Sequence, residues 1–215
     1  MSRVAVTLLA FLCVTTTFAQ PAVDPDRAQA FEGLRDADAT HRAAAVIWIA
    51  HHGDPADDEA LRRRLSDDNP QVRALAEQGL WILWGRSGDE AVDELMNKGA
   101  AQTRAGELDD AIATYSEVIR RKPAFAEGWN KRATVRYLSG DFRRSLADCD
   151  EVMKRNPHHF GALAGYGQIY LELEQYEKAI GYWKRALAAN PNMSGVEANI
   201  EIVEKLIARR RANAV

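Results

Sequence analysis

Residues 124–157 read AFAEGWNKRATVRYLSGDFRRSLADCDEVMKRNP, and residues 158–191 read HHFGALAGYGQIYLELEQYEKAIGYWKRALAANP. The second segment repeats the pattern of the first. The preceding segment carries it too, so the stretch 92–191 contains one unit three times at a spacing of 34 residues. Pro123, Pro157 and Pro191 therefore lie one period apart. A fixed period of this length is typical of stacked helical repeats.

Each unit predicts two amphipathic helices joined by a tight turn. In the first unit, Leu95 and Gly99 share one helical face, and Gly106 suits the left-handed conformation that ends a helix. Pro123 ends the second helix because proline lacks the amide donor and clashes with the preceding turn. Between these two ends, apolar residues recur every three or four positions, which is typical of a core-facing helix: Leu108, Ala111, Ile112, Tyr115, Val118 and Ile119.

Small residues occupy matching positions in both helices of every unit. They let the two helices approach closely, which favours a compact helical pair. The first helices carry Gly99, Ala133 and Gly167, and the second helices carry Ala111, Ser145 and Ala179.

This pattern resembles the tetratricopeptide repeat over 100 residues in three copies. The matching features are the large, small and aromatic positions of the first helix, the glycine turn, and the terminal proline. There are two departures: Glu174 stands where the other units have glycine, and Cys149 stands where they have an aromatic residue. The resemblance implies an all-helical, right-handed superhelix whose concave groove binds peptides or protein segments.

The resemblance also implies which residues line that groove, namely first-helix positions that point away from the second helix. The family's best-known ligand mode clamps a C-terminal carboxylate between Lys, Asn and Arg side chains. Here Met96, Ala100 and Gly165 occupy corresponding places, so a chaperone C-terminus is not the expected ligand. The expected groove residues are Asn97, Thr103, Arg104, Asn130, Lys131, Thr134, Tyr137 and Gln168.

The region 20–88 carries a second, weaker periodicity. Leu34, Asp36 and Arg42 recur 31 residues later as Leu65, Asp67 and Arg73. Each copy predicts a short helix, an Asp-rich turn and a longer helix, with the longer helices at about 40–52 and 70–84. The region resembles a pair of HEAT-type repeats. The resemblance implies that turn carboxylates and helix-start arginines form a ladder between the two copies.

Two such repeats cannot bury both of their faces alone. We therefore expect them to pack against the first unit of the stretch 89–191 and to form one continuous solenoid with it. Trp81 and Trp84 would lie in the buried seam between the two parts; the alternative is that these tryptophans form an exposed partner site. In the tail 192–215, Val196 and Ile200 begin an apolar stripe that predicts a capping helix over the last repeat.

Residues 1–19 are typical of a secretory signal peptide. Arg3 precedes an apolar run from Val4 to Val14, and small residues at Thr17 and Ala19 predict cleavage before Gln20. The run is too short for a stable membrane span, although an uncleaved anchor or a buried helix remains an alternative. The expected protein is exported, either periplasmic or secreted, and spans no membrane after cleavage.

The remaining chain offers little sign of catalysis. Residues 24–91 contain 14 acidic and 8 basic residues, which disfavours nucleic-acid binding. No phosphate-binding loop or nucleophile motif occurs, and no cofactor is expected. The adjacent His51 and His52 diverge on a helix, so a metal site is the minor interpretation. Cys149 is interpreted as a buried small hydrophobe. The histidine pair at 158–159 is interpreted as part of a linker between repeats, and the arginine run at 62–64 as a solvated face with local ion pairs.

These features together favour a non-enzymatic adaptor of a bacterial cell envelope that binds a protein or peptide partner in its groove. A structural spacer within an envelope assembly is an alternative, and a metal-binding or hydrolytic protein is another. The sequence pattern carries no information on oligomeric state.

Overall fold

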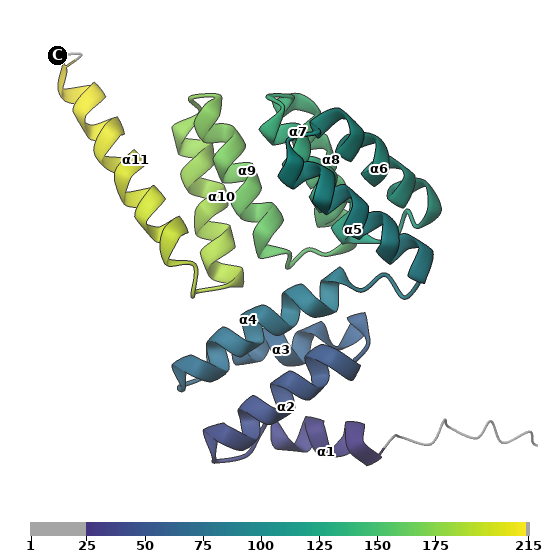
Figure 1. Cartoon of the computed structure of the whole chain (residues 1–215). Helices are drawn as coiled ribbons and strands as arrows, with labels where there is room; N and C mark the ends of the chain where they lie inside the picture. The colour runs from purple at the N-terminus through teal and green to yellow at the C-terminus, as the bar shows by residue number, and fades with distance from the viewer. Residues whose placement is uncertain (1–24, 214–215) are drawn as a thin grey trace, which may run out of the picture.

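The computed structural model describes residues 25–213, and these form eleven α-helices and a short 3-10 turn without a strand (Figure 1). The predicted all-α class is therefore confirmed. The N-terminal helices, which we call the N-terminal module, are α1 (Pro25–Gly33), α2 (Ala39–His52), α3 (Asp58–Arg64) and α4 (Pro70–Gly85), with the 3-10 turn at Pro55–Asp57. Residues 1–24, which include the expected signal peptide, lie outside the described part.

Three helical hairpins follow, each formed by one 34-residue unit. Their connecting turns need a left-handed residue, which Gly106 supplies at φ 79° and Gly140 at φ 77°. Glu174 adopts the same conformation at φ 55°, so the third turn keeps its shape despite the missing glycine. The hairpins are α5 (Glu90–Ala105) with α6 (Leu108–Arg121), α7 (Ala126–Leu138) with α8 (Phe142–Arg155), and α9 (Phe160–Glu172) with α10 (Tyr176–Ala189).

The small residues predicted inside each hairpin are required by a large partner side chain. A Cβ at Gly99 would lie 2.7 Å from Tyr115 Cζ, and a Cβ at Gly167 would lie 2.2 Å from Trp183 Nε1. Both aromatic side chains are fully buried. Close approach of the two helices therefore depends on the absence of a side chain at these glycines.

Helix α11 (Ser194–Asn213) covers α10, and its apolar stripe enters the core of the last hairpin. Val196, Ile200 and Val203 pack in one cluster with Ala179 and Trp183. The helix thus removes the last hairpin's apolar face from water, as a terminal element of a solenoid must.

Within the N-terminal module, an arginine ladder joins the two helical pairs. Arg42 donates to both carboxylate oxygens of Asp67, from Nε at 3.0 Å and from Nη2 at 2.7 Å. Arg73 repeats this arrangement one step further, donating through Nε to Asn192 Oδ1 at 3.1 Å. The predicted ladder is confirmed, and it extends beyond the module to the turn before α11. The local ion pairs expected of the run at 62–64 also form, with Asp58, Glu59 and Asp67.

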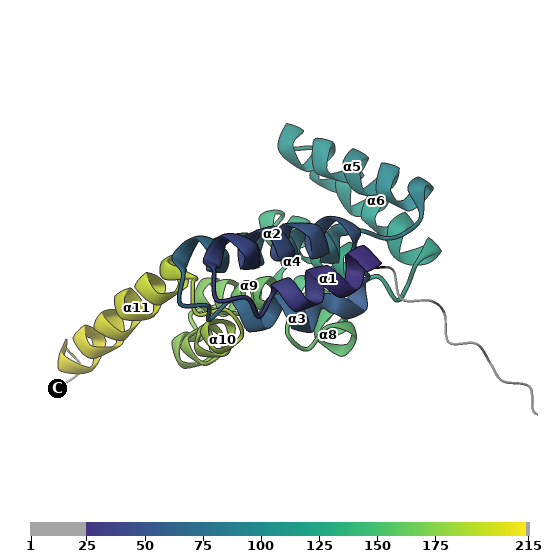
Figure 2. The same ribbon diagram turned by 90° about the horizontal axis from the view of Figure 1, so that it is seen from below.

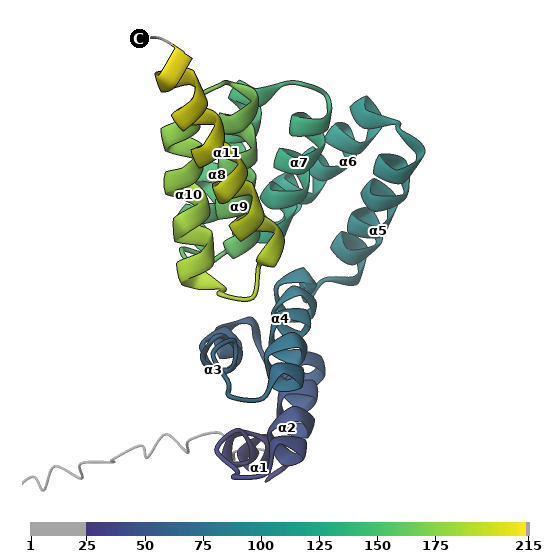
Figure 3. The same ribbon diagram turned by 90° about the vertical axis from the view of Figure 1, so that its left-hand side faces the viewer.

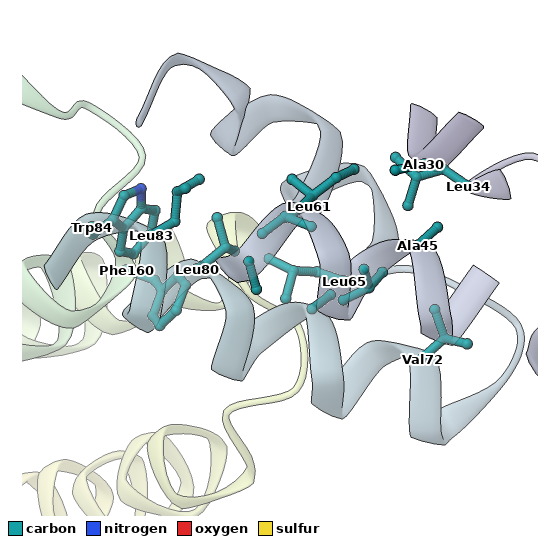
Figure 4. Packing of buried hydrophobic residues seen from close by; sticks show 14 residues of the cluster. Ala30, Leu34, Ala45, Leu61, Leu65, Val72, Leu80, Leu83, Trp84 and Phe160 are labelled. Atoms are coloured by element: carbon teal, nitrogen blue, oxygen red, sulfur yellow. The ribbon is translucent and has the colours of Figure 1, made fainter. Parts of the chain in front are cut away.

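The N-terminal module does not dock where the sequence suggested. Trp81 and Trp84 pack on Phe160 at the start of the third hairpin, with ring centroids 5.1 Å apart in both pairs. Figure 4 shows Trp84 beside Phe160. Phe160 belongs to the same buried cluster as the module's own core, and Met193 packs against that cluster. The expected seam against the first unit was therefore wrong. Trp84 is only 7% exposed, so it does not form an exposed partner site either.

The physical reason lies in the chain reversal before α5 and in the apolar residues of the inter-repeat turns. Gly88, at φ 72°, turns the chain so that α5 leads away from α4. The module then lies beneath the lower ends of the second and third hairpins, while α5 and α6 stand clear of it (Figures 2 and 3). At that edge Phe160 and Met193 offer the apolar surface that α4 buries.

Candidate functional site

An open groove runs between the first helices of the second and third hairpins and ends at α11. Its volume is about 270 Å³. It is formed chiefly by α7, α9 and α11, with three residues from the helices behind them. No charged side chain lines it. The lining residues are Asn130, Ala133, Thr134, Tyr137, Ser145, Cys149, Gly161, Ala162, Ala164, Gly165, Gln168, Ile169, Trp183, Val196 and Asn199.

The groove contains half of the residues that the sequence placed in it. Asn130, Thr134, Tyr137 and Gln168 all line it. Asn97, Thr103 and Arg104 do not, because all three lie on α5 and the groove begins at α7. Lys131 does not line it either, since its ammonium group pairs with Glu127.

Amide and hydroxyl groups give the groove its polarity. Tyr137 Oη donates to Glu172 Oε1 at 3.2 Å, and Gln168 Nε2 lies 3.4 Å from the same oxygen. Glu172 therefore holds both side chains at one end of the groove. Asn130 Nδ2 donates to Glu127 Oε2 at 3.0 Å, which fixes the orientation of that amide.

Glu127 is the centre of a buried polar network beneath the groove. Its side chain is 3% exposed and accepts from His159 Nε2 at 3.0 Å and from Lys131 Nζ at 3.0 Å. Burial alone would raise the pKa of Glu127, but the hydrogen bond from His159, together with the hydrogen bond and charge of Lys131, lowers it. Glu127 is therefore a carboxylate that accepts from all three neighbours, including Asn130.

His159 is a structural residue of this network rather than part of a linker, so that interpretation was wrong for it. Its Nδ1 accepts from the backbone N–H of Ala162 at 3.0 Å and thereby caps α9. Because Nδ1 accepts, the proton lies on Nε2, which donates to Glu127. Trp84 stacks on the imidazole, with ring centroids 4.7 Å apart and planes 24° from parallel.

Gly165 forms an open stretch of the groove wall. A Cβ added there would meet only Cys149 Sγ, at 4.0 Å. By contrast, a Cβ at Gly161, one turn earlier, would lie 2.4 Å from Trp81 Cη2. Packing therefore requires glycine at Gly161 but not at Gly165, where the missing side chain only keeps the groove open.

Cys149 is not a nucleophile in this environment. The side chain is buried, and this burial, with the nearby charges of Asp148 and Asp150, raises the pKa of the thiol to about 12. The interpretation of Cys149 as a small buried hydrophobe agrees with its place in a core cluster.

The described residues also show no candidate metal centre. Between residues 25 and 213, no three His, Cys, Asp or Glu side chains are grouped so that they could hold an ion. His52 Nδ1 lies 3.0 Å from the Trp48 carbonyl oxygen, and its ring stacks on that tryptophan. In the same range no helix is long and apolar enough to cross a membrane.

Comparisons with known proteins match this architecture. A family model described as tetratricopeptide repeat matches residues 130–194. The first TPR domain of Spaghetti (RPAP3), solved with the HSP90 peptide SRMEEVD, has 21% identity and a TM-score of 0.52, over 54% of this chain and 93% of that one. Residues 130–194 therefore match the tetratricopeptide repeat, and the wider fold is shared with solved TPR domains. The Sgt2 TPR domain from Aspergillus fumigatus also shares the fold, with 19% identity and a TM-score of 0.56, over 59% of this chain and 85% of that one.

Two curated relatives extend the comparison of these repeats. A TPR repeat-containing protein of Rhizobium etli is 28% identical over 154 residues, which cover 72% of this chain and 76% of the relative. Hsp70-Hsp90 organizing protein 1 of Glycine max is 23% identical over 117 residues, covering 53% of this chain but only 20% of that protein.

Sequence reasoning missed three groups at the site. The buried pair of Glu127 and His159 was missed because a polar residue at a helix start usually signals a cap, not a buried network. Asn199 was missed because α11 was expected only to cover the last repeat. Trp183 was missed because it is fully buried in the core of the last hairpin, although it also lines the groove.

Proposed function

We propose that this chain is a non-enzymatic interaction protein whose groove binds an extended segment of another protein. The observation that carries the proposal is an open groove with amide side chains and no charged lining residue. Asn130, Gln168 and Asn199 suit an extended main chain, because amides both donate and accept hydrogen bonds. Tyr137 adds an apolar surface with a polar tip.

The chemistry of the groove favours an uncharged stretch over an acidic chain end. Spaghetti (RPAP3) was solved with an HSP90 peptide, which supports a peptide as the class of ligand. In this chain no charged residue lines the groove, the neighbouring Lys131 pairs with the buried Glu127, and Gly165 lines the groove. A segment with small or apolar side chains above Gly165 is therefore the expected ligand.

We further propose that this binding takes place in a bacterial cell envelope or outside the cell. The proposal rests on the sequence pattern of residues 1–19. We also propose that the N-terminal module is a HEAT-like pair, in keeping with its period and its arginine ladder.

The proposed export is tested at the N-terminus. N-terminal sequencing of the exported protein should give a chain that begins at Gln20. An N-terminus at Met1 would contradict the proposed cleavage.

The groove assignment is tested by filling the groove without disturbing the fold. Gly165→Leu places a side chain in the groove, whereas Gly181→Leu places the same side chain at an exposed position of α10, where a Cβ meets nothing within 4 Å. Both substitutions replace a mid-helix glycine, so their effects on helix stability should match.

The two variants and the unchanged protein would serve as bait in an envelope extract, and captured proteins would be identified by mass spectrometry. Direct binding of each captured protein would then be measured with purified components. We expect one partner to bind the unchanged protein and Gly181→Leu alike and to lose at least tenfold in affinity for Gly165→Leu. Equal binding to all three proteins would place the partner site elsewhere.

A further inference from the structure

A second pocket lies at the junction between the N-terminal module and the repeats. Its volume is about 470 Å³. It is bounded by the connection between α4 and α5 and by the turns that precede α7 and α9, all at the lower edge of the repeats in Figure 1. It does not share a residue with the groove.

Three cationic side chains line this pocket, and two have no acidic partner. Within residues 25–213, neither Arg86 nor Lys122 forms an ion pair. Lys122 Nζ donates to the backbone oxygen of Ser87, which leaves further N–H groups of the ammonium available. Arg155 pairs with Glu151 through Nη1 at 2.6 Å, donates through Nε to the Pro123 carbonyl oxygen and stacks over Trp129. Within residues 25–213 its Nη2 forms no hydrogen bond.

The remaining lining residues do not neutralise these cations. Asp58 is the one acidic residue in the lining, and it already accepts from Trp84 Nε1 at 3.3 Å and lies 3.5 Å from Arg62 Nε. The Nη groups of Arg86 are held by carbonyl oxygens at the end of α2, so its charge is fixed at the pocket. The buried Nε of Arg86 has no hydrogen-bond partner.

Helix α7 adds a further source of positive potential. It begins at Ala126, and the preceding Phe125 provides no side-chain cap; both residues line the pocket. The first N–H groups of a helix carry a partial positive charge, and an oxyanion commonly satisfies them. By contrast, His159 caps α9 with its own side chain.

Most of the other lining residues are apolar. Trp84 and Phe125 form aromatic surfaces beside Pro55, Ala124 and Pro157, while Ser87, Asn156 and His158 add polar groups. We propose that this pocket binds a small ligand that carries an oxyanion, a carboxylate or a phosphate, on an apolar body. The oxyanion contacts Lys122, Arg155 and the start of α7, while the body lies against Trp84 and Phe125. Because both parts of the chain line the pocket, the ligand also stabilises their junction.

The test uses three probes with the purified protein: inorganic phosphate, N-acetylphenylalanine, and N-acetylphenylalaninamide, which lacks the charge. Binding would be followed by tryptophan fluorescence, because Trp84 lines the pocket, and checked by calorimetry. Lys122→Gln removes one pocket cation. Lys154→Gln is the matched control, since its side chain is exposed, pairs with Glu151 and does not line the pocket.

We expect N-acetylphenylalanine to bind most tightly, phosphate more weakly, and the amide at least tenfold more weakly than the acid. Lys122→Gln should weaken binding of the acid tenfold or more, whereas Lys154→Gln should leave it within twofold. Equal affinity for acid and amide would overturn the proposal, and so would unchanged binding by Lys122→Gln or the absence of binding by both anions. Phosphate binding as tight as that of the acid would support the oxyanion site but overturn the apolar half of the assignment.

Discussion

Replacing Gly165 with alanine should stabilise the protein and weaken partner binding at the same time. Glycine in the middle of a helix costs about 1 kcal/mol relative to alanine. A Cβ at Gly165 finds only Cys149 Sγ, at 4.0 Å, which is an ordinary contact. The gain is therefore about 1 kcal/mol in the free energy of unfolding, or about 2–4 °C in Tm for a chain of this size.

Gly167, two residues later on α9, supplies the opposite result from the same substitution. Its Cβ would lie 2.2 Å from the Nε1 of Trp183, whose indole is buried and donates to the Ala164 carbonyl oxygen at 3.2 Å. Overpacking of this kind costs about 1–3 kcal/mol, and a rigid, hydrogen-bonded ring belongs near the upper end. After the gain in helix propensity, Gly167→Ala should be destabilised by about 1–2 kcal/mol.

Urea denaturation followed by circular dichroism would measure both variants. The predicted difference in the free energy of unfolding between the two variants is about 2–3 kcal/mol, because Gly165→Ala gains about 1 kcal/mol and Gly167→Ala loses about 1–2 kcal/mol. Partner affinity of Gly165→Ala would be measured in parallel and should fall although its stability rises. A destabilised Gly165→Ala, or a Gly167→Ala as stable as the unchanged protein, would refute this account of the two glycines.

Three further predictions follow from the buried polar groups. His159→Ala should lower the free energy of unfolding by about 3 kcal/mol or more, measured by urea denaturation, because Glu127 would keep its charge with one buried partner removed; Glu127→Gln combined with it should recover part of the loss. Burial alone would raise the pKa of Asp67, but hydrogen bonds from its arginine partner and a backbone amide lower it to about 2. The stability that the ionised Asp67 carboxylate contributes is therefore complete above about pH 4 and is lost as pH falls toward 2. Asp67→Asn should abolish this part of the loss of stability in acid, as measured by thermal denaturation at a series of pH values. In a chain lacking the other cysteine, Cys149 should resist iodoacetamide at pH 8 and react only after unfolding, because its pKa is about 12; rapid labelling of the native protein, monitored by mass spectrometry, would contradict this.

The repeats could be predicted from the sequence because their signals are local. Apolar spacing and the proline at the end of each unit predict the helices without reference to the rest of the chain. The requirement for a small residue is local as well: Gly99 faces Tyr115 within one unit. The arginine ladder was predictable for the same reason, since Arg42 and Asp67 occupy equivalent places in adjacent copies.

The docking of the N-terminal module could not be predicted in this way. Connectivity suggested that α4 packs on the next unit along the chain, and Phe160 lies more than two periods beyond it in sequence. The left-handed turn at Gly88 leads α5 away from α4, and the apolar edge of the later repeats packs on the module. Neither feature has a periodic signal, because a single turn and a non-local contact occur once each.

The groove was predicted in part for a related reason. Helical register places Asn130 and Gln168 on the face that turns away from the second helix of each hairpin, and both line the groove. Helical register alone does not predict which of the three repeats line the deepest part of the groove. In this chain the space lies between the second and third hairpins and is bounded by α11, so that Asn97 and Arg104 on α5 fall outside it.

The buried network makes the N-terminal module part of the groove's construction. The amide of Asn130 is oriented by Glu127, and Glu127 accepts from His159. His159 is in turn covered by the stacked ring of Trp84 on α4. A change in the module that moves Trp84 would therefore expose the buried Glu127–His159 pair to water and release the amide of Asn130, which lines the groove. Binding in the groove and docking of the module should consequently depend on each other, although α4 supplies no residue to the groove lining.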